Sequence, residues 1–181
     1  MIKRIINKIF VVWKSVGLRI FALNNGSWIA LSAKIYIHGG GRFLIGRGVR
    51  VLPDVIISVL PGGELELKDG VIVNHASVIY CASTILIGKK ARISHFCSII
   101  DHDYDYRMTD VFDKPKVSSP IRLGNGVWLG TNVVVLKGVE IGDNSVIGAM
   151  TLVSKSVPAK CVAHGKSNNE LIIRRYDEFD Y

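Results

Sequence analysis

Aliphatic residues recur at every sixth position in the segment 121–158. The leading positions are Leu123, Leu129, Val135, Ile141, Ile147 and Val153. The residue four places after each is small or β-branched: Val127, Val133, Val139, Ser145, Thr151 and Val157. A short fixed period indicates repeats that cannot bury their apolar faces alone and must stack on one another. The pattern therefore predicts an all-β solenoid.

A period of six matches neither an α-helix nor a simple two-sided strand. It suits flat-sided coils in which one side chain per hexad points to the axis and a turn closes each corner. The frame returns upstream at Leu67, Val73, Ile79, Ile87, Ile93 and Ile99. The step from Ile79 to Ile87 is eight residues, which predicts a loop or bulge. A sandwich of short strands is the alternative, but its turns do not keep one hexad over six repeats.

Composition fits one compact domain. The chain has 181 residues, of which 49% are hydrophobic and 18 are glycine, enough for one substantial core with many corners. Its three cysteines, Cys81, Cys97 and Cys161, are scattered and form no CxxC motif. They predict reduced thiols in a cytoplasmic protein rather than a disulfide framework or a zinc site. Cys97 occupies a small inward position of the hexad, so we expect it to pack in the core.

The formal net charge of +8 is concentrated at the start of the chain. Residues 1–22 hold five Lys or Arg and no acid, with apolar residues at helical spacing. This predicts a basic amphipathic helix over 1–24 that is too interrupted by Lys to span a bilayer. Three roles stay open: a cap on the solenoid, a contact with partner subunits, or a peripheral contact with an anionic membrane surface. The basic residues form no recognisable nucleic-acid motif.

One long segment interrupts the hexads. The stretch 101–120 is polar and acidic, and Ile99 and Leu123 stand four hexads apart, so we expect a loop that projects and returns in register. His102 lies at its base between Asp101 and Asp103. A histidine is a natural general base at neutral pH, and neighbouring carboxylates orient its ring. The alternative is an ordinary solvated loop histidine.

The hexads, the projecting loop, the run Val127–Thr131 and the run Gly142–Ala149 resemble hexapeptide-repeat acyltransferases. Within them the chain looks like the galactoside and maltose O-acetyltransferases and the sugar O-acetyltransferases of polysaccharide biosynthesis. The resemblance covers about residues 35–165. It implies a left-handed parallel β-helix over 25–165, followed by a tail over 166–181. It also implies a homotrimer with active sites between neighbouring solenoids.

The resemblance implies that His102 is the catalytic base. It would deprotonate a sugar hydroxyl that attacks the thioester of acetyl-CoA, with direct transfer and no metal. Contacts with the cofactor are implied at Trp128, Gly130, Thr131, Ala149, Ser154, Lys155 and Lys166. Contacts with the acceptor sugar are implied at Asn74 and Asp101.

The chain departs from the family pattern at the end of the solenoid. Residues 164–169 read HGKSNN, without the usual proline and with Asn169 at the basic position, and Met150 replaces a common glycine. Contacts with the phosphates of CoA are therefore expected at Lys166, Arg174 or Arg175. Weak binding of CoA and a different acyl carrier are the alternatives.

The residues leave two other functions open. A zinc-dependent hydratase like the γ-carbonic anhydrases would need three converging imidazoles, for which His75, His95 and His102 are the candidates. A non-catalytic scaffold of a polysaccharide assembly is the other. The interpretation favoured by the sequence is a trimeric, cytoplasmic, acetyl-CoA-dependent sugar O-acetyltransferase. Its substrate would be a nucleotide- or lipid-linked precursor of a cell-surface polysaccharide.

Overall fold

The computed structural model describes residues 22–23, 25–105, 116–165 and 170–176. Nearly all of its strands belong to three sheets. Sheet A contains β1 (Trp28–Ile29), β4 (Arg50–Val51), β7 (Ile72–Val73), β10 (Arg92–Ile93), β15 (Trp128–Leu129), β18 (Val146–Ile147), β20 (Cys161–Gly165) and β21 (Leu171–Arg175). Sheet B contains β2 (Lys34–Ile37), β5 (Ile56–Val59), β8 (Val78–Cys81), β11 (Ser98–Ile100), β16 (Val134–Val135) and β19 (Leu152–Val153). Sheet C contains β3 (Arg42–Ile45), β6 (Glu64–Leu67), β9 (Thr84–Ile87), β14 (Ile121–Leu123) and β17 (Glu140–Ile141).

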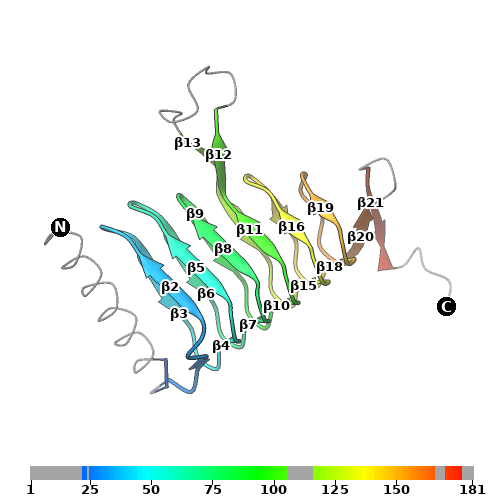
Figure 1. The fold of residues 1–181 in the computed structure, drawn as a ribbon. Coiled ribbons are helices and arrows are strands. Elements are labelled where there is room, and N and C mark those ends of the chain that lie inside the picture. Colours follow the sequence, from blue (N-terminus) through cyan, green and yellow to red (C-terminus); the bar gives the residue numbers. More distant parts are fainter. Residues whose placement is uncertain (1–21, 24, 106–115, 166–169, 177–181) are drawn as a thin grey trace, which may run out of the picture.

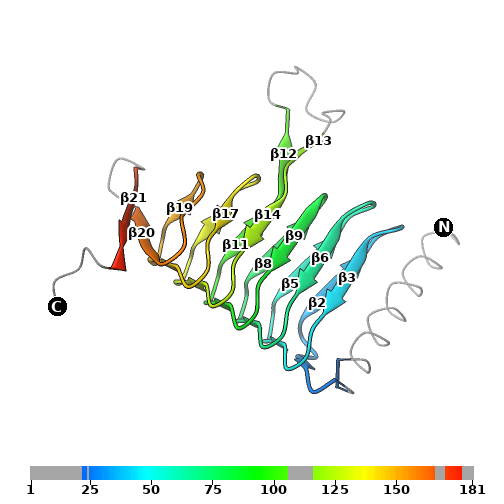
Figure 2. The same cartoon turned by 180° about the vertical axis from the view of Figure 1, so that it is seen from behind.

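The chain visits the three sheets in turn and climbs one strand per circuit (Figures 1 and 2). Neighbouring strands are parallel, apart from the β20–β21 pair, and residues one coil apart stand in register. Leu129, for example, pairs with Ile93 on one side and Ile147 on the other. The predicted parallel β-solenoid, the left-handed β-helix of the hexapeptide-repeat proteins, is confirmed.

The interior is a column of aliphatic side chains from all three walls. Every leading position of the predicted hexads, from Leu67 to Val153, is fully buried. Small polar residues of the hexads are buried too, because their hydroxyls bond the backbone between coils. Ser145 Oγ donates to the Pro158 carbonyl at 2.7 Å and accepts from the Cys161 amide at 3.2 Å. Cys97 is buried as expected.

Coil length changes along the solenoid. Trp28 pairs with Arg50, a step of 22 residues, whereas Trp128 pairs with Val146, a step of 18 residues or three hexads. The predicted interruption between Ile79 and Ile87 lies at the corner between sheets B and C. There Ala82 and Ser83 separate β8 from β9.

Close stacking of the coils explains the glycines of the hexads. A Cβ added to Gly130 would lie 2.6 Å from the Ala149 amide nitrogen, and one added to Gly142 would lie 2.3 Å from that of Ala159. Neither contact is possible for a real side chain. Met150 stands at a corner with a left-handed φ of 57°, and its side chain is 81% exposed.

The predicted loop leaves the solenoid where β11 ends. Its base is an antiparallel ribbon of β12 (His102–Tyr104) and β13 (Lys116–Ser118), which projects beyond the coils (Figure 1). The predicted N-terminal helix lies outside the described residues, except for its last few. β21 pairs antiparallel with β20, so sheet A extends into the segment assigned to the tail. Among the described residues no helix is long and apolar enough to cross a membrane.

Candidate functional site

His102 begins the projecting ribbon at the corner between sheets B and C. The preceding residue, Asp101, is still held in the solenoid: its amide donates to the Tyr80 carbonyl at 3.3 Å, and its carbonyl accepts from the Ser119 amide at 2.9 Å. These two backbone hydrogen bonds therefore fix the point at which the chain leaves the solenoid. His102 is placed by the end of the regular coil rather than by the loop itself.

The Asp101 carboxylate is fully buried and has several partners. Oδ1 accepts from the Ala82 amide at 2.7 Å, and Oδ2 accepts from the Ser83 amide at 2.7 Å. These two amides belong to the residues inserted between β8 and β9 in the preceding coil. A buried carboxylate requires such donors, since an unpaired buried charge is costly.

Asp101 also orients the catalytic candidate. His102 Nδ1 lies 3.0 Å from Asp101 Oδ1, and the His102 side chain is 10% exposed. An ionised carboxylate only accepts hydrogen bonds, so Nδ1 carries the proton in the neutral ring and Nε2 keeps its lone pair. This is the tautomer that a general base needs.

A cleft of about 330 Å³ lies at His102. Its lining residues come from the ends of β11, β16 and β19 and from both sides of the projecting ribbon: Ile100, His102, Asp103, Ser119, Leu136, Lys137 and Ser154. Lys137 forms an ion pair with Asp103 across this cleft. Lys137 and Ser119 were not found by the sequence reasoning, because only the stacking of coils brings them beside His102.

The other predicted residues divide between the two ends of sheet B. Ser154 shares the cleft with His102, and the exposed Lys155 follows it. Asn74, Gly130, Thr131 and Ala149 instead lie at the corner between sheets A and B, before the strands of sheet B begin. Within one chain the structure does not bring these residues to His102. Lys166 lies outside the described residues.

Residues at the A–B corner are tied to the backbone. The Thr131 carbonyl accepts from the Met150 amide at 2.8 Å. Asn74 Nδ2 donates to the Ile93 carbonyl at 2.9 Å. Trp128 stands on the outer face of sheet A, half exposed, with Nε1 donating to Ser94 Oγ at 3.1 Å. Hydrogen bonds between coils thus hold this corner, and Trp128 beside it remains half exposed.

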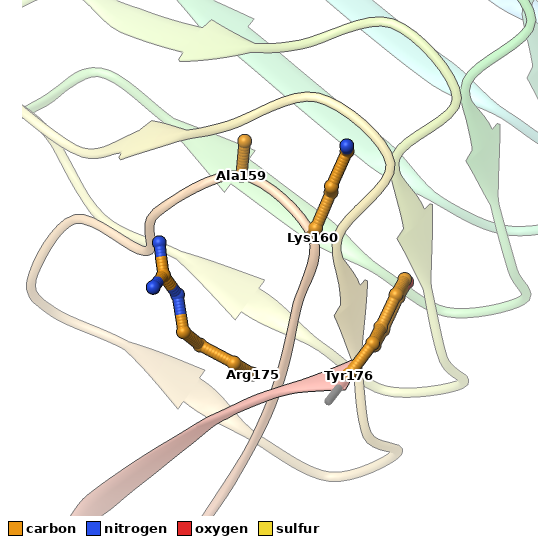
Figure 3. Close-up of a pocket in the computed structure, with 4 residues that line it drawn as sticks. All are labelled: Ala159, Lys160, Arg175 and Tyr176. Carbon is orange, nitrogen blue, oxygen red and sulfur yellow. The ribbon is translucent and has the colours of Figure 1, made fainter. Parts of the chain in front are cut away.

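A second pocket, of about 320 Å³, lies at the far end of the solenoid. Lys160 and Arg175 line it with Ala159 and Tyr176 (Figure 3). Arg175 was one of the expected phosphate contacts. The Tyr176 hydroxyl donates to the Asn144 carbonyl, which places this pocket at the corner between sheets C and A, away from His102.

Two alternative chemistries find little support among the described residues. His75 and His95 stack with ring centroids 5.4 Å apart at the A–B corner, while His102 stands at the opposite end of sheet B. No described cluster of three His, Cys, Asp or Glu residues could hold a metal.

A covalent mechanism through a cysteine would need a thiolate. Burial, and then the Asp101 charge, raises the pKa of the Cys81 thiol to about 12. Such a thiol supplies no thiolate nucleophile at neutral pH.

Comparison with known proteins gives the family. Residues 120–155 match the model for bacterial transferase hexapeptide repeats (six repeats). The galactoside O-acetyltransferase of Escherichia coli is 33% identical over 67% of this chain and 59% of its own length. A protein of E. coli named as a colanic acid biosynthesis acetyltransferase, WcaF, is 31% identical over 90% of this chain and 85% of its own.

Other relatives are longer or more distant. This chain spans only 35% of a Mycobacterium tuberculosis protein named as an acetyltransferase, Rv3034c, with which it shares 33% identity over 57% of its length. The fold is also that of the N-acyltransferase AntD of Bacillus cereus, solved as a mutant with dTDP and coenzyme A. The TM-score is 0.71 at 20% identity, over 84% of this chain and 83% of AntD. The extent of the match to WcaF, together with the repeat motif and the coils that it builds, shows that this chain belongs to the hexapeptide-repeat acetyltransferases.

Proposed function

We propose that this protein transfers an acetyl group from acetyl-CoA to a hydroxyl group of a sugar, with His102 as the general base. The observation that carries the proposal is the hydrogen bond between the buried Asp101 carboxylate and His102 Nδ1, which leaves Nε2 free at the cleft. Asp101, expected from the sequence to contact the acceptor, has no exposed surface in this chain. We therefore give it the role of positioning His102.

In this mechanism the sugar hydroxyl donates its hydrogen bond to Nε2. As the oxygen attacks the thioester carbonyl, the proton passes to Nε2, and the imidazolium is stabilised by Asp101. Collapse of the tetrahedral intermediate breaks the carbon–sulfur bond, and the imidazolium returns the proton to the departing thiolate of CoA. Backbone amides of a neighbouring coil would stabilise the oxyanion. Each proton that His102 takes is given back within one turnover.

The complete site in this proposal needs a second copy of the chain. His102 lies at one end of sheet B, and Asn74, Thr131 and Ala149 lie at the other. The outer face of sheet B between them is largely apolar: Tyr36, Ile56, Val78, Tyr80, Ile100, Val134, Leu136 and Leu152. A homotrimer would cover this face and set the His102 end of one chain against the A–B corner of the next. Apolar contact area of this kind stabilises obligate oligomers.

The relatives support the proposed substrates. Enzymes named for galactosides, for lipopolysaccharide and for colanic acid are similar to this chain, and AntD was solved with a nucleotide and coenzyme A. We propose as acceptor a nucleotide- or lipid-linked precursor of a cell-surface polysaccharide. The three buried free thiols accord with the reducing cytoplasm as the place of action, and the basic segment 1–22 provides for peripheral contact with the inner membrane face.

The test is a direct assay of acetyl transfer. The purified protein is incubated with acetyl-CoA and a panel of neutral, nucleotide-linked and lipid-linked sugars, and products are identified by mass spectrometry. The proposal predicts an O-acetylated sugar together with one equivalent of free CoA. Failure of acetyl-CoA to bind at millimolar concentration would reject the enzyme and leave the scaffold role.

A further inference from the structure

The outer face of sheet A carries a single row of side chains parallel to the solenoid axis. Because β1, β4, β7, β10 and β15 are each two residues long, each presents one side chain outward and one inward. The strand pairing aligns the outward residues in the order Trp28, Arg50, Ile72, Arg92 and Trp128. We call these five residues the sheet A row.

The two arginines of the row are not neutralised. No strand of sheet A contains an acidic residue. Within the part of the chain that the structure describes, neither the Arg50 nor the Arg92 guanidinium has an ion pair or a side-chain hydrogen bond, and both residues are exposed. This is an unpaired positive charge on a rigid surface, which favours an anionic ligand.

Sheet C, unlike sheet A, carries acidic residues beside its arginines. There Arg42 forms an ion pair with Glu64, and Arg122 stands in register with Glu140 on the next strand. The same solenoid therefore places an acidic residue in register with each of these two arginines on sheet C, and none in register with Arg50 or Arg92 on sheet A. Sheet C also supplies a matched control surface.

The spacing of the two arginines in the row suits a linear ligand that carries a diphosphate group. Neighbouring strands are about 4.8 Å apart, so the Cα atoms of Arg50 and Arg92 are separated by about 10 Å. Guanidinium groups at that separation can converge on a diphosphate, each with its own fork of donors. The half-exposed indoles of Trp28 and Trp128 flank the two arginines and offer flat apolar faces, and beyond Trp128 the outward positions continue with Val146 and Val162. A surface one side chain wide fits a linear ligand better than a membrane plane.

The row also runs into the residues expected to bind the two substrates. Trp128 belongs to the expected CoA contacts. Asn74, an expected contact of the acceptor sugar, directly follows β7, two residues after Ile72. We propose that the sheet A row binds the phosphate or diphosphate group of the acceptor sugar, with Arg50 and Arg92 as the phosphate ligands. This inference rests on the proposed function and specifies its acceptor as an anionic glycosyl phosphate.

The test measures binding without turnover. Inorganic pyrophosphate, uridine diphosphate and farnesyl diphosphate are titrated calorimetrically into the full chain, the variant R50Q/R92Q and the sheet C control R42Q/R122Q. Thermal unfolding checks that all three proteins are folded. We expect R50Q/R92Q to weaken diphosphate binding by at least about tenfold, the effect of losing charge-assisted hydrogen bonds. The control variant should bind as the wild type does.

The three probes separate the sources of the phosphate. Tighter binding of uridine diphosphate than of pyrophosphate indicates a nucleotide-linked acceptor, and tighter binding of farnesyl diphosphate indicates a lipid-linked one. The proposal is overturned if both variants lose the same affinity for diphosphates, or if the wild type binds no diphosphate. So does a result in which R50Q/R92Q only releases the protein from phosphatidylglycerol vesicles. Because the titration needs no acetyl transfer, it tests phosphate binding independently of the proposed enzyme activity.

Discussion

Asp101 Oδ1 lies 3.0 Å from His102 Nδ1, and the same carboxylate accepts hydrogen bonds from the amides of Ala82 and Ser83 in the coil below. One buried side chain thus joins two coils and fixes the ring of the candidate base. The positioning of His102 therefore depends on the stacking of the solenoid, and a defect in that stacking would reach the site directly.

This double role gives a prediction for Asp101→Asn. The amide group of asparagine would direct a donor at one of the two backbone amides, so we expect a loss of about 1–3 kcal/mol in the free energy of unfolding. We expect kcat to fall as well, because His102 loses the charge that stabilises its protonated form. Urea denaturation and steady-state kinetics measure the two effects. Glu140→Gln, on the outer face of sheet C, is the exposed control; equal behaviour of both variants would contradict the assignment.

The buried hydroxyls of the hexads can be tested at Ser145. Alanine there would leave the Pro158 carbonyl and the buried Cys161 amide without their partner. We expect Ser145→Ala to cost about 1–3 kcal/mol in the free energy of unfolding. Ser156→Ala removes a similar bond to the exposed Glu140 amide, where water can replace it, and should cost less than about 0.5 kcal/mol. Identical denaturation midpoints would show that the buried bonds add no stability.

The buried thiol of Cys81 predicts a loss of stability at high pH. Its pKa is about 12 in the folded protein against 9.0 for the ordinary group, so the folded state keeps the proton that the unfolded chain gives up. Stability from this group is complete below pH 9 and declines between pH 9 and 12. Urea midpoints measured across this range should fall less steeply in Cys81→Ala. Parallel curves for the two proteins would refute the explanation.

A charge on the outer face of sheet B should prevent assembly. Val78 lies half-buried in the middle of that face, and Val78→Glu would place a carboxylate where we propose that copies pack. We expect wild-type trimers and variant monomers in sedimentation velocity runs. Thr84→Glu, on the outer face of sheet C, should remain trimeric. A monomeric wild type, or a trimeric Val78→Glu variant, would exclude sheet B as the interface.

The sequence predicts the walls of this fold well because each wall is a local pattern. Leu129 and Ile147 are fully buried in register, as a period of six requires. The interruption after Ile79 and the projecting loop were also predicted, since both appear as breaks in the period. The contacts that the residues of these two segments make were not predicted. That Ala82 and Ser83 present their amides to Asp101 depends on which residues stack one coil apart.

The site was predictable only in part for the same reason. The sequence identifies His102 and predicts that a neighbouring carboxylate orients its ring, but it does not say whether Asp101 or Asp103 does so. Lys137, which stands 35 residues after His102 in the chain, reaches the cleft because β16 stacks on β11. The role of His102 itself stays a prediction. So does the meeting of His102 with Thr131 and Ala149, because a single chain holds them at opposite ends of sheet B.

The most direct measurement compares acetyl transfer by the wild type, His102→Ala and the control His38→Ala, which lies at the first strand of sheet B. Loss of a general base lowers kcat by about 10²–10⁴-fold. We expect this for His102→Ala, with the KM for acetyl-CoA unchanged and with a cooperative thermal transition that shows the variant to be folded. His38→Ala should retain wild-type kcat. If His102→Ala transfers acetyl groups at the wild-type rate, His102 is not the base and the central claim is wrong.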